Sequence, residues 1–304
     1  DINRVLGNVY ANYQATDWLT FDYKVGIDAY SDFREQRFAI SSFGDDIGGV
    51  GQVNLNNLSN VDFYQDFIAR GTFNLTEDLG LNALLGHNIT TSSFVDRFQR
   101  GRILAVRDFY NLNNASDRYA SNNLTEIATT AFFGQLEFSY KDFLFVTATG
   151  RRETSSTFEL EDNTFFYPSV SASMVFTELW GDRPEWFNFG KIRYSYAQTG
   201  ISPIAYATRP IYTSPIFTDG FTNGLSFPYL GQNGFGISDI FYSPDLKPER
   251  NNANEYGLNL VFMDRKIDLD FTYYSHRSTD ALLFQPLAPS TGFSSASVNG
   301  GALA

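Results

Sequence analysis

The residue types that most often carry chemistry are sparse in this sequence. It contains two histidines, His87 and His276, and no cysteine, so neither a disulfide scaffold nor a thiolate metal site can form. No nucleophile elbow, P-loop, HExxH pair or glycine-rich dinucleotide motif occurs in a strand-to-helix setting. Both histidines lie near the ends of strand-like segments, which favours a polar structural role over catalysis or ligation. The sequence therefore predicts no enzymatic activity, no cofactor and no metal.

One acidic cluster has the composition of a cation-binding loop. Asp45 and Asp46 lie among Gly44, Gly48 and Gly49, and carboxylate oxygens are the ligands that calcium prefers. The spacing does not fit the twelve-residue EF-hand loop. A flexible acidic loop is the favoured interpretation.

A second cluster combines both signs of charge. Arg151 and Arg152 are followed by Glu153 and Glu159. These side chains could contact an anionic substrate or another part of the protein, or they could form a ladder of ion pairs, and both readings stay open. The whole chain has a formal net charge of −12, which argues against nucleic acid as a partner because phosphate binding needs clustered Lys and Arg.

The segment 201–245 is rich in aromatic residues set among Gly, Pro and Ser. Exposed aromatic patches mark binding sites, and aromatic faces suit sugar rings or a partner protein. Packing of the segment onto its neighbours is the alternative. The residues expected to contact substrate or partner are Tyr206, Tyr212, Phe221, Tyr229 and Phe235.

The elements around these clusters are predicted by an alternation of apolar and polar residues. In the segment 19–29 apolar side chains alternate with Thr20, Asp22, Lys24 and Asp28. Side chains on a strand point alternately to opposite faces, so one face is apolar and the other polar. The run of about eleven residues fits the ~9–11 of a tilted membrane strand, whereas strands of soluble proteins average ~5–6.

The same pattern recurs, and ten strands are predicted. No apolar run approaches the ~18 residues typical of a transmembrane helix, which excludes a helical membrane protein. The expected strands are 5–13, 19–29, 66–75, 79–85, 132–140, 144–151, 169–176, 192–197, 255–262 and 267–273.

The connections between these strands alternate between short and long. Tight polar turns are expected at 16–17, 76–78, 141–142 and 264–266, with a longer one at 178–190 on the same side. Long connections are expected at 31–60, 91–123, 152–167 and 200–253. Short turns at one rim and long loops at the other are typical of a bacterial outer-membrane β-barrel.

Aromatic residues flank the short turns, as in the interfacial girdle of a membrane barrel. They are Tyr13, Trp18, Tyr140, Phe143 and Phe262. The alternative is a soluble β-sandwich, which also buries one face of each strand but seldom needs such long strands and lopsided loops. We therefore predict an all-β fold, part of a large antiparallel transmembrane barrel.

From residue 131 onward, short motifs resemble the SusC/RagA family of TonB-dependent outer-membrane transporters. The run AFFGQLEFSYKDFLFVTATGRRETSSTF resembles a hairpin of that family, FFYPSVSASMVFTE and KIRYSYAQTG resemble its next two strands, and LKPERNNANEYGLNL resembles the start of a later one. Thr291-Gly292 and Asn299-Gly300 resemble a following motif. The positions that carry the resemblance are Gly134, Tyr140, Asp142, Arg152, Ser155, Ser156, Pro168, Ser169, Arg193, Thr199, Gly200, Leu246, Pro248, Glu249, Glu255 and Gly257.

The resemblance implies a function. Members of the family have a twenty-two-stranded barrel, an N-terminal plug and a segment that engages TonB. They import oligosaccharides or peptides across the bacterial outer membrane beneath a SusD-like lipoprotein. The sequence departs from the family pattern at Met174, at Ala197 and at Glu153-Thr154, and the substrate stays undefined. A siderophore- or haem-type receptor or a porin is the first alternative, and a structural or adhesive surface β-protein is the second.

Backbone hydrogen bonding indicates the extent of the domain. Ten strands in an open sheet would leave two edges exposed to lipid, which lipid does not tolerate. We therefore expect residues 1–304 to be one part of a barrel domain, with the plug, the first strands and the last strands lying outside this sequence.

Overall fold

A computed structural model describes residues 1–42, 48–181, 184–213, 216–217, 225–227 and 229–303. Strands dominate, and the helical segments of the described part are three short 3₁₀ turns, η1 (Leu112–Asn114), η2 (Phe176–Leu179) and η3 (Pro289–Thr291). Within the described ranges, no helix is long and apolar enough to cross a membrane.

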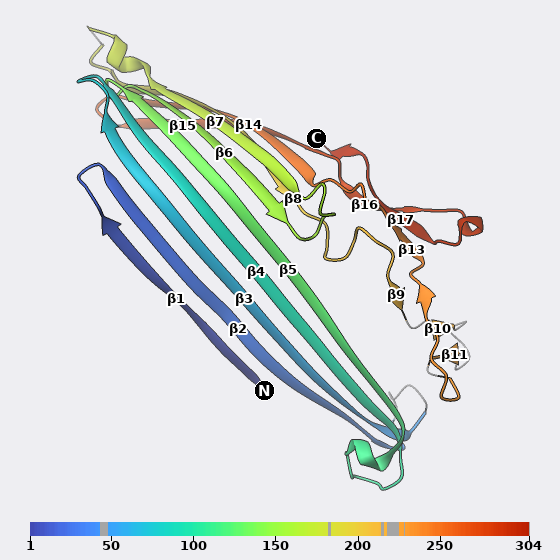
Figure 1. Cartoon of the computed structure of the whole chain (residues 1–304). Coiled ribbons are helices and arrows are strands. Elements are labelled where there is room, and N and C mark those ends of the chain that lie inside the picture. Colours follow the sequence, from blue (N-terminus) through green and yellow to red (C-terminus); the bar gives the residue numbers. More distant parts are fainter. Residues whose placement is uncertain (43–47, 182–183, 214–215, 218–224, 228, 304) are drawn as a thin grey trace. The chain divides into compact units, whose positions relative to one another are not determined.

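The main sheet contains eleven strands that follow one another almost entirely in chain order (Figure 1). Ten of them are long, which confirms the predicted number, and the eleventh has two residues. In order across the sheet they are β1 (Ile2–Gln14), β2 (Leu19–Ile40), β3 (Val50–Asn74), β4 (Leu79–Leu104), β5 (Ala115–Tyr140), β6 (Leu144–Ser155), β7 (Thr164–Val175), β8 (Phe187–Ile201), β14 (Glu249–Phe262), β15 (Ile267–Thr279) and β18 (Ala302–Leu303).

The chain forms two compact units, and each is described by itself. The first consists of Asp1–Ala69 and Gly86–Thr130, and the second of Arg70–Leu85 and Ala131–Ala304.

In the first unit, β1 and β2 form an antiparallel hairpin in which Val9 lies opposite Val25. Even-numbered residues of both strands share the polar face. There, Arg4 Nε donates a hydrogen bond to Asp28 at 2.8 Å, and Asp22 accepts hydrogen bonds from Tyr10 and Asn12. Asp22 is only 3% exposed. A buried carboxylate is tolerable because it is hydrogen-bonded.

The connections predicted at 31–60 and 91–123 are wrong in extent. Strand β2 continues to Ile40 and β3 begins at Val50, while β4 continues to Leu104 and β5 begins at Ala115. These outer halves carry polar residues on both faces, so the apolar alternation that marks a strand in the sequence is missing. Side-chain pairs along the sheet satisfy them instead, for example Arg37 with Glu35 at 2.6 Å.

In the second unit, β6, β7, β8, β14 and β15 pair antiparallel without interruption. The pairing places Thr147, Ser171, Ser195 and Glu255 in one row across four strands. The connection predicted at 152–167 is shorter than expected, because β6 ends at Ser155 and β7 begins at Thr164.

The long connection between β8 and β14 is confirmed, and it contains short strands that the sequence did not indicate. They are β9 (Tyr212–Thr213), β10 (Ile216–Phe217), β11 (Leu225–Ser226), β12 (Gly236–Ile237) and β13 (Ile240–Tyr242). Strand β13 runs parallel to β17 (Ser295–Asn299), which pairs antiparallel with β16 (Leu282–Pro286). A small separate sheet therefore joins this connection to the segment after β15.

The short turns lie where the sequence predicts them, and aromatic rings gather beside them in the second unit. Tyr140 and Phe143 make an edge-to-face contact with centroids 5.7 Å apart, and Trp186 stacks on Phe262 at 6.0 Å. Hydrogen bonds link adjacent turns, as from the Lys141 N–H to the Asp78 carbonyl at 2.8 Å.

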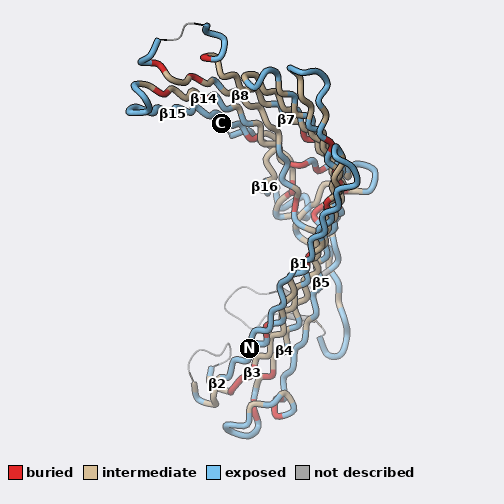
Figure 2. The backbone as a smooth tube through the Cα atoms, turned by 90° about the vertical axis from the view of Figure 1, so that its left-hand side faces the viewer, coloured by how far each residue is buried: buried red, intermediate tan, exposed pale blue. Residues whose placement is uncertain are grey.

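The distribution of burial is the reverse of that in a water-soluble sheet. Buried residues, red in Figure 2, are scattered along the strands rather than collected in a layer. Large apolar side chains on the predicted apolar face are exposed, including Ile27, Phe132 and Phe271, whereas Asp22 and Asp32 on the polar face are buried. An apolar face exposed this widely needs a nonaqueous environment, which a lipid bilayer supplies.

Candidate functional site

Hydroxyl groups and a few charges make up the polar face of β6–β8, β14 and β15 in the second unit. Strand alternation places these side chains on the face opposite the exposed apolar residues. Ser and Thr are small, so this face stays shallow and offers donors and acceptors at short range. Its residues include Thr147, Thr149, Ser169, Ser171, Ser173, Lys191, Arg193, Ser195, Glu255, Asp270 and Thr272.

Arg193 spans two strand spacings on this face. Its Nη2 donates to Asp270 Oδ1 at 2.9 Å and to Thr272 at 3.1 Å. The guanidinium passes over Gly257, where an added Cβ would lie 2.3 Å from Arg193 Nε. Two motif residues, Arg193 and Gly257, are thus linked, because the missing side chain at Gly257 leaves room for the guanidinium of Arg193.

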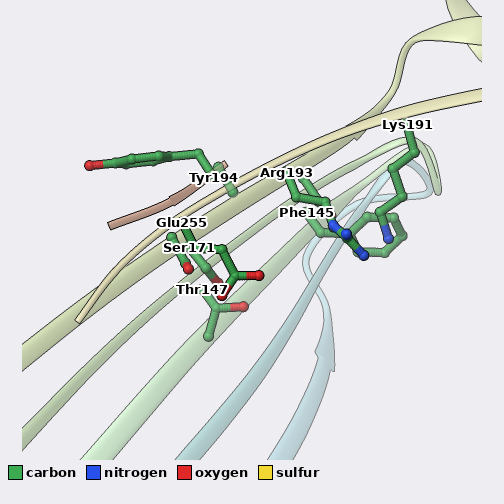
Figure 3. A pocket seen from close by; sticks show the side chains of 10 residues that line it. Phe145, Thr147, Ser171, Lys191, Arg193, Tyr194 and Glu255 are labelled. Carbon is green, nitrogen blue, oxygen red and sulfur yellow. The ribbon is translucent and has the colours of Figure 1, made fainter. Parts of the chain in front are cut away.

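A pocket of about 260 Å³ opens beside this arginine (Figure 3). The ends of Lys191 and Arg193 lie near the Phe145 ring at one side of the pocket, and Thr147, Ser171 and Glu255 lie toward the other side. The pocket therefore has a cationic side, a floor of hydroxyl groups and a carboxylate at the far side.

A second pocket of about 360 Å³ lies farther along the same strands, toward the long connections. Arg151 and Glu153 form an ion pair at its edge, with Nη2 and Oε2 2.7 Å apart. Tyr167 lies over Gly200, whose added Cβ would be 2.2 Å from the tyrosine hydroxyl. Four motif residues contribute to the lining, namely Pro168, Ser169, Thr199 and Gly200.

The residues of the predicted charge cluster, namely Arg151, Arg152, Glu153 and Glu159, do not form one group. Arg151 forms an ion pair with Glu153, while Glu159 accepts a hydrogen bond from Arg209 Nε at 2.7 Å. Arg152 is exposed and, as the neighbour of Arg151 on a strand, belongs to the opposite face.

Other motif residues build turns rather than a binding site. The Ser155 hydroxyl lies 2.9 Å from that of Thr157, and both residues are buried in the connection from β6 to β7. Ser156 is exposed beside them, and the Phe158 ring packs on Phe165 at 4.6 Å. These contacts close the hairpin end.

A similar joint precedes β14. Leu246 and Pro248 are buried, and Asn299 clamps the backbone of Lys247 between them. The Lys247 N–H donates to Asn299 Oδ1 at 2.8 Å, and Asn299 Nδ2 donates to the Lys247 and Asp280 carbonyls. Glu249 begins the strand itself.

The remaining motif residues lie near the short turns. An added Cβ at Gly134 would lie 3.4 Å from the Leu84 carbonyl oxygen, a close approach of neighbouring strands. Asp142 takes a positive φ of 55° in the turn after Tyr140. Lys141 ties this turn to the next through its contact with Asp78, with Nζ and Oδ2 3.5 Å apart.

The aromatic residues expected to contact a ligand or partner are exposed where the structure describes them. Tyr206, Tyr212, Tyr229 and Phe235 all have half or more of their surface accessible, with Tyr212 reaching 74%. Phe221 lies outside the described residues. Strands β9 and β12 form a short ribbon in which Tyr212 lies opposite Ile237, and Phe235 immediately precedes β12.

Among the other candidate residues, the two histidines lie apart from any chemical centre in the described part of the chain. His87 Nε2 lies 3.0 Å from the Thr130 hydroxyl, and His276 is exposed on β15. Asp45 and Asp46 lie outside the described residues. In the part of the chain that the structure describes, no three His, Asp or Glu residues are grouped to hold a metal ion.

Sequence reasoning missed Tyr167 and Phe145, each of which lines a pocket on the polar face. Both residues have aromatic rings at positions where the strand alternation predicts polar side chains. The alternation alone therefore gives no reason to assign them to a site. The glycine at 200 was the available signal, since a strand glycine often marks a close approach.

Comparison with known proteins places this fold. Residues 2–302 match the family model described as TonB dependent receptor-like, beta-barrel. Two TonB-dependent receptors of Formosa agariphila, P26 and P3, are 28% and 26% identical over 64% and 97% of this chain. Those matches cover 19% and 29% of the two receptors, so the chain spans less than a third of their length.

Solved structures show the same fold. The RagAB peptide transporter superposes with a TM-score of 0.84 at 18% identity, covering 99% of this chain and 33% of that one. The siderophore receptor PiuA of Acinetobacter baumannii gives 0.50 at 11% identity, covering 98% and 42%. The chain belongs to the TonB-dependent receptor-like β-barrel family of the bacterial outer membrane.

Proposed function

We propose that this chain is a wall segment of an active importer that moves oligosaccharides or peptides across the outer membrane, driven by TonB and assisted by a SusD-like surface lipoprotein. Transport of this kind needs gated passage and no covalent step, so we assign no catalytic residue.

The observation that carries the proposal is the inverted distribution of polarity in the sheet. Phe271 on the apolar face of β15 is 65% exposed, while its neighbour Thr272 accepts a hydrogen bond from Arg193 on the opposite face. In a closed barrel the polar face lines the lumen. Hydroxyl groups and paired charges along that lumen suit the passage of a hydrophilic solute.

The exposed aromatic ribbon of β9 and β12 supports a surface partner or ligand. Tyr212, Phe235 and Ile237 are each more than half exposed, and such apolar side chains on a long connection favour a contact outside the barrel wall. The connection is braced by β13 and β17, so the ribbon extends from a fixed base.

A siderophore-type receptor is the second candidate. The siderophore receptor PiuA shares the fold, and we take uptake under this candidate to depend on TonB as well. The higher TM-score of the RagAB peptide transporter supports the first candidate at the level of fold.

The test is uptake by cells that express the full-length protein. Labelled peptides, labelled oligosaccharides and a ferric siderophore would be compared in cells with and without functional TonB. The proposal predicts TonB-dependent accumulation of a peptide or an oligosaccharide and co-purification of a lipoprotein. Uptake of the siderophore alone would favour the second candidate, and TonB-independent diffusion of all three would contradict both.

A further inference from the structure

We propose that the pocket beside Lys191 binds a carboxylate group at its cationic side, with the Lys191 ammonium as the counter-ion and the Ser173 hydroxyl as a neighbouring donor. The inference rests on the proposed transport function for its biological setting, and on the geometry of the second unit for its chemistry.

The two cations that border the pocket differ in their contacts. Arg193 is already engaged, because Nη2 donates to Asp270 and Thr272. Within the described residues, the Lys191 ammonium has neither an ion pair nor a hydrogen bond, although its side chain is half-buried at the pocket wall. Partial burial removes some of the water that would hydrate the ammonium, and no protein group replaces it. Binding of an anion at this position is therefore favoured.

Hydroxyl groups line the floor of the pocket. On the cationic side, Ser173 lies opposite Arg193, and its hydroxyl can donate one hydrogen bond. The hydroxyls of Thr147, Ser171 and Ser195 lie in the row that ends at Glu255. A carboxylate has two oxygens and about four lone-pair sites to satisfy. The Lys191 ammonium, with its three donors, and the Ser173 hydroxyl can meet that demand without a rigid fork.

The far side of the pocket carries a carboxylate. Glu255 lies opposite Ser195 and, in the described part of the chain, has no hydrogen-bonded or ionic partner. A ligand with an acidic group at Lys191 and an N–H group or ammonium toward Glu255 would complement both sides. A peptide has this polarity, and a neutral sugar does not.

The carboxylate could come from the transported solute or from the protein itself. Both sources share the same chemistry at Lys191 but differ in when they occupy it. A solute occupies the pocket only when it is added, whereas a carboxylate of the protein contributes to stability in the absence of solute.

The experiment uses the full-length protein in detergent as wild type, Lys191→Gln, Lys191→Arg and Lys266→Gln. Lys266 is exposed in the turn before β15, so its variant is the matched control for loss of one positive charge. Each protein is titrated with two N-acetylated peptides of identical sequence, one with a free C-terminal carboxylate and one amidated. The thermal unfolding midpoint is also measured without peptide.

A carboxylate from the solute predicts that the wild type binds the free-acid peptide about tenfold more tightly than the amide, as expected for one charge-assisted hydrogen bond. Lys191→Gln should abolish that preference, while Lys191→Arg and Lys266→Gln should keep it. A carboxylate from the protein predicts no preference between the peptides but a lower midpoint for Lys191→Gln than for Lys266→Gln, again with Lys191→Arg close to wild type.

Equal behaviour of Lys191→Gln and Lys266→Gln in both measurements would overturn the inference. The uptake experiment answers a separate question. Wild-type cells that accumulate no substrate would contradict the transport function and leave the peptide preference and the unfolding midpoints as independent results.

Discussion

The long strands β2–β5 and the short strands β6–β8, β14 and β15 differ in how far they extend past the length needed to cross a membrane. The long strands have 22 to 26 residues, and the short ones 12 to 15. A tilted membrane strand needs only ~9–11. The long strands therefore have an outer half that extends beyond the apolar band, and the short strands change into connections near its edge.

The side chains follow that difference. In the outer half of β2, Arg34 pairs with Asp32 and Arg37 pairs with Glu35, each with an N–O distance of 2.6 Å. On the short strands the polar face is dominated by hydroxyls and by one arginine that spans two strands. Apolar alternation therefore marks only the part of a strand that lies within lipid. Beyond that part, pairing of polar side chains can continue the sheet.

The largest expected effect comes from a charge on the apolar face. Phe271→Arg on β15 should destabilise the folded protein in lipid vesicles by about 2–4 kcal/mol, the cost of an arginine near the bilayer midplane. Phe33 has the same parity as the apolar residues of β2 but lies fourteen residues beyond Leu19, in the outer half. Phe33→Arg should cost no more than about 1 kcal/mol, as near a membrane interface.

Denaturant titrations in vesicles measure both variants. Equal costs for Phe271→Arg and Phe33→Arg would break the distinction between the two regions, since it would place both residues at the same depth.

The next effect compares a glycine from each region. An added Cβ at Gly26 would lie 2.1 Å from Tyr64 Cζ, in a site where Lys24 covers the tyrosine ring at 5.2 Å. At Gly257 the obstructed group is the flexible arginine 193. Gly26→Val should destabilise by about 1–3 kcal/mol because a rigid ring must leave its place, and Gly257→Val should cost less.

Unfolding midpoints in the same detergent check the order of the two glycine variants. If Gly257→Val lowers the unfolding midpoint more than Gly26→Val does, the Arg193–Asp270 ion pair contributes more to stability on the short strands than ring packing does on the long ones.

A smaller and local effect is expected at the joint before β14. Asn299→Ala removes three hydrogen bonds between its side chain and the backbone of Lys247 and Asp280. Each of these hydrogen bonds contributes about 0.5–1.5 kcal/mol, so loss of all three should accelerate hydrogen exchange in residues 240–248 at least tenfold. Asn123→Ala, at an exposed position of β5, is the control. Unchanged hydrogen exchange in residues 240–248 would contradict this role of the Asn299 side chain.

The smallest effect is the pH dependence of a loop contact. Hydrogen bonding from Arg209 and then Thr208 lowers the pKa of Glu159 below its usual range. Since the folded pKa is the lower one, the contact stabilises the fold above the ordinary glutamate range and is lost as the pH falls through the folded value.

Both side chains of that contact reach solvent, so the loss should be slight. Hydrogen exchange around residues 156–163, corrected for intrinsic rates, should rise slightly in acid in the wild type and be independent of pH in Glu159→Gln. An identical acid response in the two proteins would place the titration elsewhere.

Much of the main sheet could be predicted because its physics is local. The run from Leu19 to Ala29 alternates without a break, and the turn at Thr16-Asp17 fixes its pairing with the preceding strand. A lipid-facing strand must show this pattern, since each exposed polar side chain would be costly in hydrocarbon.

The parts that escaped prediction depend on distant partners. The outer half of β2 has no apolar face to reveal it, and β13 pairs with β17 across some fifty residues in a parallel register. Likewise, the fit of Tyr167 over Gly200 depends on strand register, which a single sequence does not specify. The motif residues share a family resemblance, but their roles in a turn, in a backbone contact or in a pocket wall depend on neighbours that are distant in the sequence.

The central claim is that odd-numbered residues of β15 face lipid and even-numbered ones do not. Single cysteines from 267 to 273 in the full-length protein, spin-labelled in a bilayer, would be exposed to oxygen, which enters lipid, and to a water-soluble nickel chelate. The account predicts high oxygen accessibility at Ile267, Leu269, Phe271 and Tyr273, and low values at the residues between them. Accessibility to oxygen that is uniform, or that peaks at the even positions, would contradict it.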